Sequence, residues 1–240
     1  MASAASQVSM GFGVLEYGVP LLLGVTGSIA AGKSLLCTHL AEAHGAVHVD
    51  ADREVHRMYV PDTPGFERVV AEFGEEIVGE DGVIDRRVLG GMVFGKPERM
   101  EALRTAIGDI PAYFMALLER WREELPEDGI GVLEAVNLLE RDYMTKADAA
   151  WLVVTADETA ITRLMETRSL SREEAEQRLA SARDWRERAP AADRIFHNDG
   201  TQEAYLATVD EAIRETVAAH RAGKLPRPRW YAAQESGAQG

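Results

Sequence analysis

Eight residues, GSIAAGKS (27–34), decide how this chain folds. They follow the apolar run VPLLLGVT (19–26) and precede LLCTHLAEAH (35–44), in which leucines recur at helical spacing. Glycines let main-chain N–H groups approach phosphate oxygens, a lysine adds positive charge, and a serine hydroxyl is a ligand for Mg²⁺. The pattern G-x-x-x-x-G-K-S therefore predicts a phosphate-binding loop, although an ordinary strand-to-helix turn also favours glycine and serine.

Two aspartates follow the next expected strand, in VHVDAD (47–52). A small-molecule kinase needs a carboxylate near the carboxyl ends of its strands to orient the acceptor hydroxyl. Asp52 is our candidate for this role, and helix N-capping is the alternative for both Asp50 and Asp52. Regulatory GTPases carry an N-K-x-D motif, which this chain lacks, so a kinase is favoured.

Composition limits the other classes of function. The net charge of −14 argues against a sequence-independent nucleic-acid binder, which needs a basic face. One cysteine allows no internal disulfide, and no apolar run reaches the roughly 18 residues of a membrane span. Residues 1–19 contain no Lys or Arg, so a loose extension is expected and not a signal peptide. A soluble, cytoplasmic protein follows; its oligomeric state is left open.

Strand and helix patterns alternate in the order expected of an α/β protein with a doubly wound parallel sheet. Strands are expected at the apolar runs beginning near residues 20, 46, 129, 149 and 194. The nucleotide-binding core then comprises 20–51, 127–157 and 191–221. A helical insertion is expected over 52–126, a charged helical lid over 158–190, and a flexible tail over the Pro- and Gly-rich residues 222–240.

Several further motifs give the chain a resemblance to the dephospho-coenzyme A kinase family, from about residue 21 to 218. In order along the chain they are TGSIAAGKS (26–34), DAD (50–52), DGVIDRRVL (81–89), VFGKP (93–97), VLEAVNLLE (132–140) and ADRIFHNDG (192–200). The phosphate-binding loop is common to many families. The pair formed by D-A-D and D-G-x-[LI]-D-R is more specific.

The resemblance implies a P-loop kinase that transfers the γ-phosphoryl group of ATP to the ribose 3′-hydroxyl of dephospho-CoA, with Mg²⁺. It implies that Asp52, Lys33 and the lid's Arg168 are catalytic, and that Ser34 holds the metal. Residues implied to bind ATP are Gly27, Ser28, Ile29, Ala30, Ala31, Gly32, Lys33, Ser34, Leu35 and Asn198. Residues implied to bind the acceptor are Asp52, Arg86, Glu140 and Arg163.

The sequence departs from the family pattern at four places. Gly108-Asp109 stands where the family has His-Pro, Val136 replaces the proline of P-L-L-F-E, Thr167 occupies the lid arginine's position beside Arg168, and Ala182 replaces a glutamine. Glu134 and Glu140 keep their acidic character.

The alternatives are a diverged kinase acting on another nucleotide or nucleoside, and an ATP-binding protein without turnover. For the DGVIDR motif, a turn followed by capping at Asp85 competes with a binding role for Arg86, and lid arginines also suit i,i+4 pairs with glutamates.

Overall fold

The computed structural model describes residues 18–237. The extension expected over 1–19 therefore lies outside the described residues, except for Gly18 and Val19. No helix among residues 18–237 has the length and apolar character needed to span a membrane.

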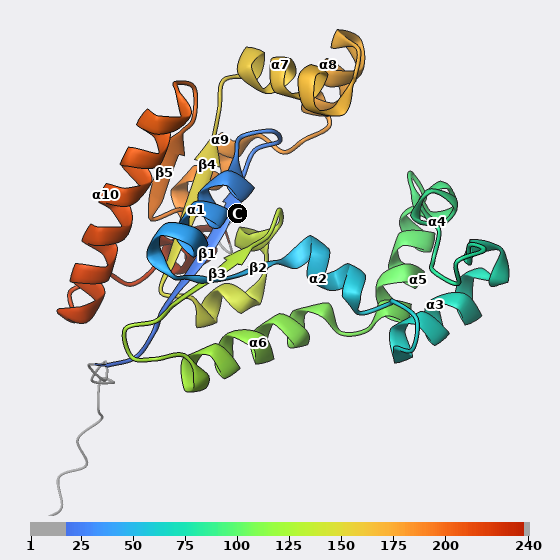
Figure 1. The fold of residues 1–240 in the computed structure, drawn as a ribbon, viewed down its shortest axis with the longest axis horizontal. Coiled ribbons are helices and arrows are strands. Elements are labelled where there is room, and N and C mark those ends of the chain that lie inside the picture. The colour runs from blue at the N-terminus through green and yellow to red at the C-terminus, as the bar shows by residue number, and fades with distance from the viewer. Residues whose placement is uncertain (1–17, 238–240) are drawn as a thin grey trace, which may run out of the picture.

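Five parallel strands form one sheet in the order β2-β3-β1-β4-β5, so the doubly wound sheet predicted from the sequence is confirmed (Figure 1). All seven residues of β1 are buried, because the strand is central and covered on both faces. The strands are β1 (Leu21–Gly27), β2 (Val47–Asp50), β3 (Ile130–Glu134), β4 (Ala149–Val154) and β5 (Arg194–His197). They end at one edge, where the loop 28–32 leaves β1.

Alternate residues of β1 supply two separate cores. Leu21, Leu23 and Val25 pack with α1 (Lys33–His44) and α10 (Gln202–Arg221) on one face. Leu22 packs on the other face with α6 (Ile110–Glu124) and the short 3₁₀ helices η2 (Leu138–Glu140) and η3 (Asp142–Lys146). This alternation is the period-two consequence of a strand buried on both sides.

Helices cover residues 51–124, the region in which a helical insertion was expected. Besides α6 the elements are α2 (Ala51–Arg57), α3 (Pro64–Phe73), η1 (Glu75–Ile77), α4 (Arg86–Val93) and α5 (Pro97–Ile107). Figure 1 shows α3, α4 and α5 apart from the sheet. They share a core of their own around Val69, Phe73, Ile77 and Leu89. Asp85 caps α4 by accepting hydrogen bonds from the main-chain N–H groups of Arg87 and Val88, as the capping alternative required.

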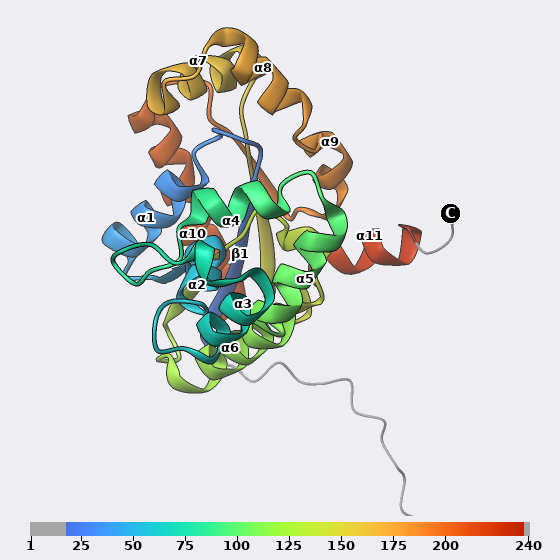
Figure 2. The same ribbon diagram turned by 90° about the vertical axis from the view of Figure 1, so that its right-hand side faces the viewer.

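The charged region 157–191 arches over the carboxyl edge of the sheet (Figure 2). The predicted capping box is present: Ser171 accepts from the N–H of Glu174, whose carboxylate in turn accepts from the N–H of Ser171. The elements are α7 (Asp157–Arg168), α8 (Arg172–Ala180), α9 (Trp185–Arg188) and η4 (Ala189–Ala191).

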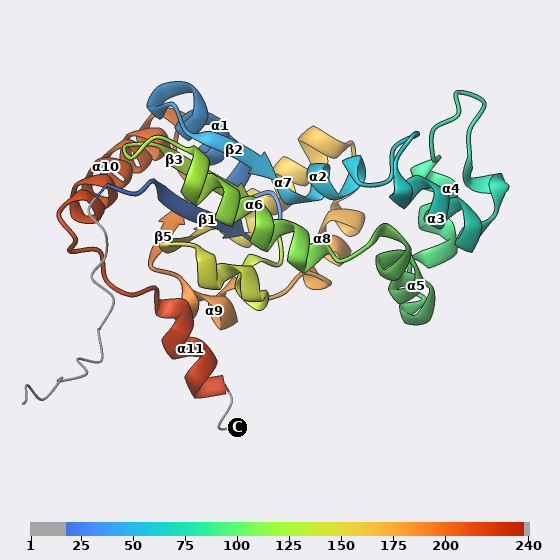
Figure 3. The same cartoon turned by 90° about the horizontal axis from the view of Figure 1, so that it is seen from below.

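The expectation of a flexible tail over 222–240 is wrong for α11 (Arg229–Gly237). Figure 3 shows α11 on the side of the strands opposite α1 and α10. Trp230 is 6% exposed, and its indole N–H donates to the carbonyl of Leu139 at 2.8 Å. The prolines and glycine of this segment indicated fraying, but one tryptophan that buries its ring and satisfies its N–H is enough to dock a short helix.

Candidate active site

The phosphate-binding loop has the backbone that its sequence predicted. Gly32 adopts φ = 94°, in the left-handed region, and a Cβ there would collide with the amide of Asn198. At Gly27 a Cβ would collide with the carbonyl of Val153. No side chain caps the helix α1 that begins at Lys33. Its first N–H groups and the positive end of its dipole are therefore available to an anion.

The side chains between the two glycines anchor the loop to its surroundings. Ile29 and Ala30 pack against the lid core of Ile161, Leu164 and Ala175. Ala31 is fully buried in the sheet core, against which Leu35 also packs. These side chains hold the loop in place, and the N–H groups of its main chain are the part suited to phosphate.

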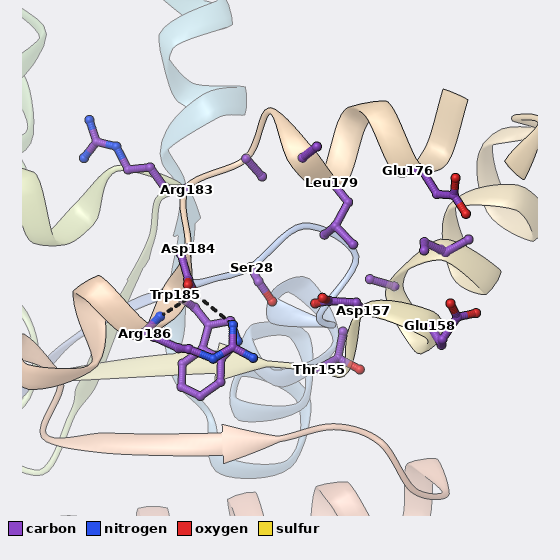
Figure 4. Close-up of a pocket in the computed structure, with 14 residues that line it drawn as sticks. Ser28, Thr155, Asp157, Glu158, Glu176, Leu179, Arg183, Asp184, Trp185 and Arg186 are labelled. Carbon is purple, nitrogen blue, oxygen red and sulfur yellow. Dashed lines mark hydrogen bonds and ion pairs between the residues drawn. The ribbon is translucent and has the colours of Figure 1, made fainter. Parts of the chain in front are cut away.

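Ser28 lines a cavity between the phosphate-binding loop and the charged helices 157–191. Its N–H donates to the carbonyl of Val153 at 2.9 Å, while its hydroxyl is buried without a hydrogen-bond partner among the described residues. Figure 4 shows Ser28 between Thr155 and Asp157, at the end of β4, and Leu179 and Arg183 of the lid. The cavity measures about 450 Å³. An unpartnered buried hydroxyl in a cavity is the kind of group that a ligand satisfies.

Glu134, at the carboxyl end of β3, is the main residue to which we had assigned no role. The hydroxyl of Ser34 donates to its Oε1 at 2.7 Å, and His48 Nε2 lies 3.1 Å from Oε2. Burial opposes ionisation, but these hydrogen bonds and the Lys33 charge outweigh it and lower the pKa of Glu134. An acidic residue that ends a buried strand was the available signal, but pairing of β3 with β1 is what brings it to the loop.

Asp50 and Asp52 have different tasks. Asp50 caps α2 by accepting hydrogen bonds from the main-chain N–H groups of Asp52 and Arg53. The side chain of Asp52 lines a second cavity, which is described below. Partial desolvation there, followed by repulsion from Asp50, raises the pKa of Asp52, although the nearby Lys33 charge acts to lower it. The capping role thus belongs to Asp50, and Asp52 lies between the loop and the second cavity.

The second cavity, of about 880 Å³, lies between the sheet edge and the helical region, and Asp52 lines it. Aromatic rings line it too, among them Tyr59, Phe114 and Tyr143, as does the guanidinium-bearing Arg141. Arg86 is exposed at the start of α4. Burial of His56 in the cavity wall is the main cause that lowers its pKa, and the positive charge of Arg86 lowers it further. Arg86 therefore lies within electrostatic range of this cavity without being part of its lining.

Two residues implied to bind ligands also make hydrogen bonds to the phosphate-binding loop. Arg163 donates to the carbonyls of Ala30 and Asn198, at 3.3 and 2.9 Å, and does not line the second cavity. The side-chain amide of Asn198 is buried and donates to the carbonyl of Ala31 at 2.8 Å. Arg163 and Asn198 each donate to a carbonyl of the loop, and these contacts suit residues that position it. The implied role of Arg163 in binding the acceptor stays a prediction.

The structure separates Arg168 and Glu140 from the second cavity. Arg168 is exposed at the end of α7 and makes no ion pair or hydrogen bond within the described chain. Glu140 pairs with Arg183 at 2.8 Å and with Arg188 at 3.6 Å. Among the lid arginines, Arg172 makes the expected i,i+4 pair with Glu176.

Arg188 was not expected to matter, but it is 8% exposed at the sheet edge. Its guanidinium donates to the hydroxyl of Thr26 in β1 and to the carbonyl of Val136, while its Nε lacks a hydrogen-bond partner in the part of the chain described. Burial lowers the pKa of Arg188, and Glu140 opposes this effect. A charge-rich sequence such as DWRERAP gave no sign that one of its arginines enters the core.

Known proteins share this arrangement of loop, sheet and helical regions. A model of the dephospho-CoA kinase family matches residues 21–204. A dephospho-CoA kinase of Symbiobacterium thermophilum is 39% identical over 194 residues, which cover 80% of each chain. A dephospho-CoA kinase of Geobacter sulfurreducens is 36% identical, covering 79% of this chain and 95% of the relative.

Solved structures of similar fold support the same family. The crystal structure of TT1252 from Thermus thermophilus has a TM-score of 0.66 and 27% identity, covering 82% of this chain and 97% of that one. A dephospho-CoA kinase from Campylobacter jejuni has a TM-score of 0.54 and 25% identity, covering 81% and 96%. The family match includes the phosphate-binding loop, Asp52, Glu134 and the whole lid. This chain belongs to the dephospho-CoA kinase family.

Proposed function

We propose that this kinase transfers the γ-phosphoryl group of ATP to the ribose 3′-hydroxyl of dephospho-CoA, the last step of CoA biosynthesis. The observation that carries the assignment of roles is the position of Asp52. It lines the larger cavity and lies close enough to Lys33 for the two charges to interact. A hydroxyl bound in that cavity would meet a carboxylate on one side and the phosphate-binding loop on the other.

The loop provides the donor site. The uncapped N-terminus of α1, the N–H groups of residues 28–32 and the Lys33 ammonium are suited to a triphosphate. The free Ser28 hydroxyl lies in the adjoining cavity under the lid. Because the net charge of −14 repels anions, attraction of the triphosphate depends on this local concentration of N–H donors and the Lys33 charge.

Ser34 and Glu134 fit a magnesium ion. Both offer oxygen atoms, the ligands that Mg²⁺ prefers, and they already lie 2.7 Å apart at the start of α1. When bound, the ion supplies neutralisation of charge on the phosphate oxygens. Glu134 is ionised at neutral pH because its pKa is lowered, so it would favour a cation at this place.

Asp52 orients the acceptor hydroxyl and accepts its proton. Phosphoryl transfer needs alignment of the attacking oxygen more than covalent chemistry from the protein. The raised pKa of Asp52 makes its carboxylate a better proton acceptor than that of an ordinary aspartate. Aromatic rings in the cavity wall offer apolar surface to a large acceptor.

The test is ADP release by the purified full-length chain with ATP, Mg²⁺ and one acceptor at a time. Dephospho-CoA is compared with a panel of nucleosides and nucleotides, and Lys33→Ala serves as the control for contaminating kinases. We expect turnover with dephospho-CoA that Lys33→Ala lowers by more than about 100-fold. Faster turnover with another acceptor would redirect the assignment to a diverged kinase. Tight ATP binding without turnover on any acceptor would support a non-catalytic binding protein.

A further inference from the structure

A cluster of two histidines and an aspartate lies where α1 and α10 pack together, and the phosphoryl-transfer reaction makes no use of it. His39 and His44 come from α1, and Asp210 comes from α10. The distances to Asp210 Oδ1 are 2.7 Å from His39 Nε2 and 2.6 Å from His44 Nε2. The two rings meet edge to face, with centroids 5.8 Å apart.

Both imidazoles converge on one oxygen. An ionised carboxylate offers about four lone-pair positions over two oxygens. Within residues 18–237, Oδ2 of Asp210 makes no hydrogen bond, although two donors compete for Oδ1. If the three side chains served only to hold the two helices together, one histidine bonded to each oxygen of Asp210 would use the hydrogen-bonding capacity of the carboxylate better. Side-chain nitrogen and oxygen atoms that converge on one point are arranged as a single bound metal ion requires.

The chemistry of the three groups suits a transition metal. Two imidazole nitrogens with one carboxylate oxygen form a common donor set for Zn²⁺, whereas Mg²⁺ prefers oxygen alone. Ligand atoms about 2.1 Å from a tetrahedral zinc lie roughly 3.4 Å apart. The three candidate ligand atoms all lie within 4.8 Å of one another, so small side-chain rotations would bring them to that spacing.

The surroundings permit access. The side chains are 19%, 20% and 33% exposed for His39, His44 and Asp210. An ion can therefore enter from solvent, and water can fill a fourth position. The chain's net charge of −14 favours the approach of cations in general.

We propose that His39, His44 and Asp210 form a zinc-binding site that joins α1 to α10. The site would fasten the phosphate-binding helix to the closing helix of the core. It is separate from the Ser34–Glu134 pair, which lies at the opposite end of α1. The proposal does not depend on the proposed kinase reaction.

The test is calorimetric titration of the full-length chain with ZnCl₂, without nucleotide or Mg²⁺, together with thermal unfolding. We expect one zinc ion per chain with a micromolar or lower Kd, and a rise in Tm of about 5 °C or more at hundredfold excess over Kd. Asp210→Asn keeps an oxygen acceptor for both histidines, so the metal-free protein should stay folded and lose at most the roughly 1 kcal/mol of a partly exposed ion pair, whereas the zinc-dependent rise in Tm should disappear. His39→Asn should also lose it.

His220→Asn is the matched control, because this histidine lies on α10 outside the cluster and should leave zinc binding unchanged. A second group, Cys37, His48 and Glu134, also brings possible ligand atoms together. Cobalt substitution distinguishes the two, since only a cysteine ligand produces a thiolate-to-cobalt charge-transfer band. The proposal is overturned if wild-type protein binds no zinc, if Asp210→Asn and His39→Asn bind it as wild type does, or if the cobalt adduct carries that band.

Discussion

At the scale of single residues, two aspartates only two positions apart illustrate how function depends on direction. Asp50 uses its carboxylate to accept hydrogen bonds from the first N–H groups of α2, whereas Asp52 lines the second cavity. The sequence alone could propose either role for either residue. The end of β2 and the start of α2 decide between them.

Replacing Asp52 separates activity from stability. Asp52→Asn should lower kcat by more than about 100-fold, because the proton acceptor is lost. It should not lower Tm at neutral pH, since the native environment disfavours the charge of Asp52 through burial and repulsion by Asp50. Steady-state kinetics and thermal unfolding check both points.

Asp50→Asn is the control for this prediction. Asparagine is also a good N-cap, so most activity and stability should survive. A rate for Asp52→Asn within a few-fold of wild type would mean that Asp52 is not the proton acceptor.

The raised pKa of Asp52 also sets the acid limb of the pH profile. The base must be ionised to act, so kcat/KM should fall as pH drops through a pKa above that of an ordinary aspartate. The cause is burial first and Asp50 second, so Asp50→Asn should move this limb to lower pH. A limb that stays in place in Asp50→Asn would assign it to another group.

At the scale of elements, the lid and the phosphate-binding loop form one connected assembly. Ile29 and Ala30 pack against α7 and α8, and Arg163 of α7 donates to the carbonyl of Ala30. A movement of the lid would therefore displace the loop residues that contact it. Arg168, at the far end of the same helix, is exposed and free of partners among the described residues.

The two arginines of α7 should respond differently to removal. Arg163→Ala should raise KM for ATP and lower Tm, because the loop carbonyl of Ala30 and the carbonyl of Asn198 beside the loop lose a charged hydrogen-bond donor. Arg168→Ala should leave Tm unchanged and lower kcat if this arginine neutralises charge when the lid closes. Kinetics and unfolding of both variants check this. A harmless Arg168→Ala together with a severe loss of kcat in Arg163→Ala would assign the lid's catalytic charge to Arg163.

At the scale of the whole molecule, residues 58–107 have a hydrophobic core that is separate from the two cores of the sheet. Val55 and Ile110, on α2 and α6, pack against both this core and the sheet core below it. The second cavity, which we propose binds the acceptor, lies at this junction. From this separation of cores we expect that the helical region can open without unfolding the sheet.

A matched pair of substitutions tests that independence. Ile77 and Ile213 are 0% and 1% exposed, in the helical core and in the sheet core. Each change to valine should cost about 1 kcal/mol, or roughly fivefold in local opening. Ile77→Val should speed native-state hydrogen exchange in α3–α5 alone, whereas Ile213→Val should affect the strands. Equal effects of both variants throughout the chain would mean that the molecule opens as one unit.

The sequence alone determined the fold class and the position of the phosphate-binding loop. The apolar runs, the glycine loop and the helical periodicities predicted the parallel sheet, its five strands and the phosphate-binding loop, because these features depend on short-range patterns of burial and backbone freedom. Side-chain partners across long separations were not predictable. The contact of Ser34 with Glu134 spans 100 positions, and Asn198 reaches the carbonyl of Ala31 across 167.

Only the tertiary structure decided which polar groups face the two cavities and which make hydrogen bonds to the loop. Strand pairing brings Glu134 to the loop, the path of α7 turns Arg163 onto it, and docking of Trp230 orders a segment with the composition of a tail. The physical reason is that a hydrogen bond depends on distance and direction in space, and neighbours along the chain specify neither once the chain has folded back on itself.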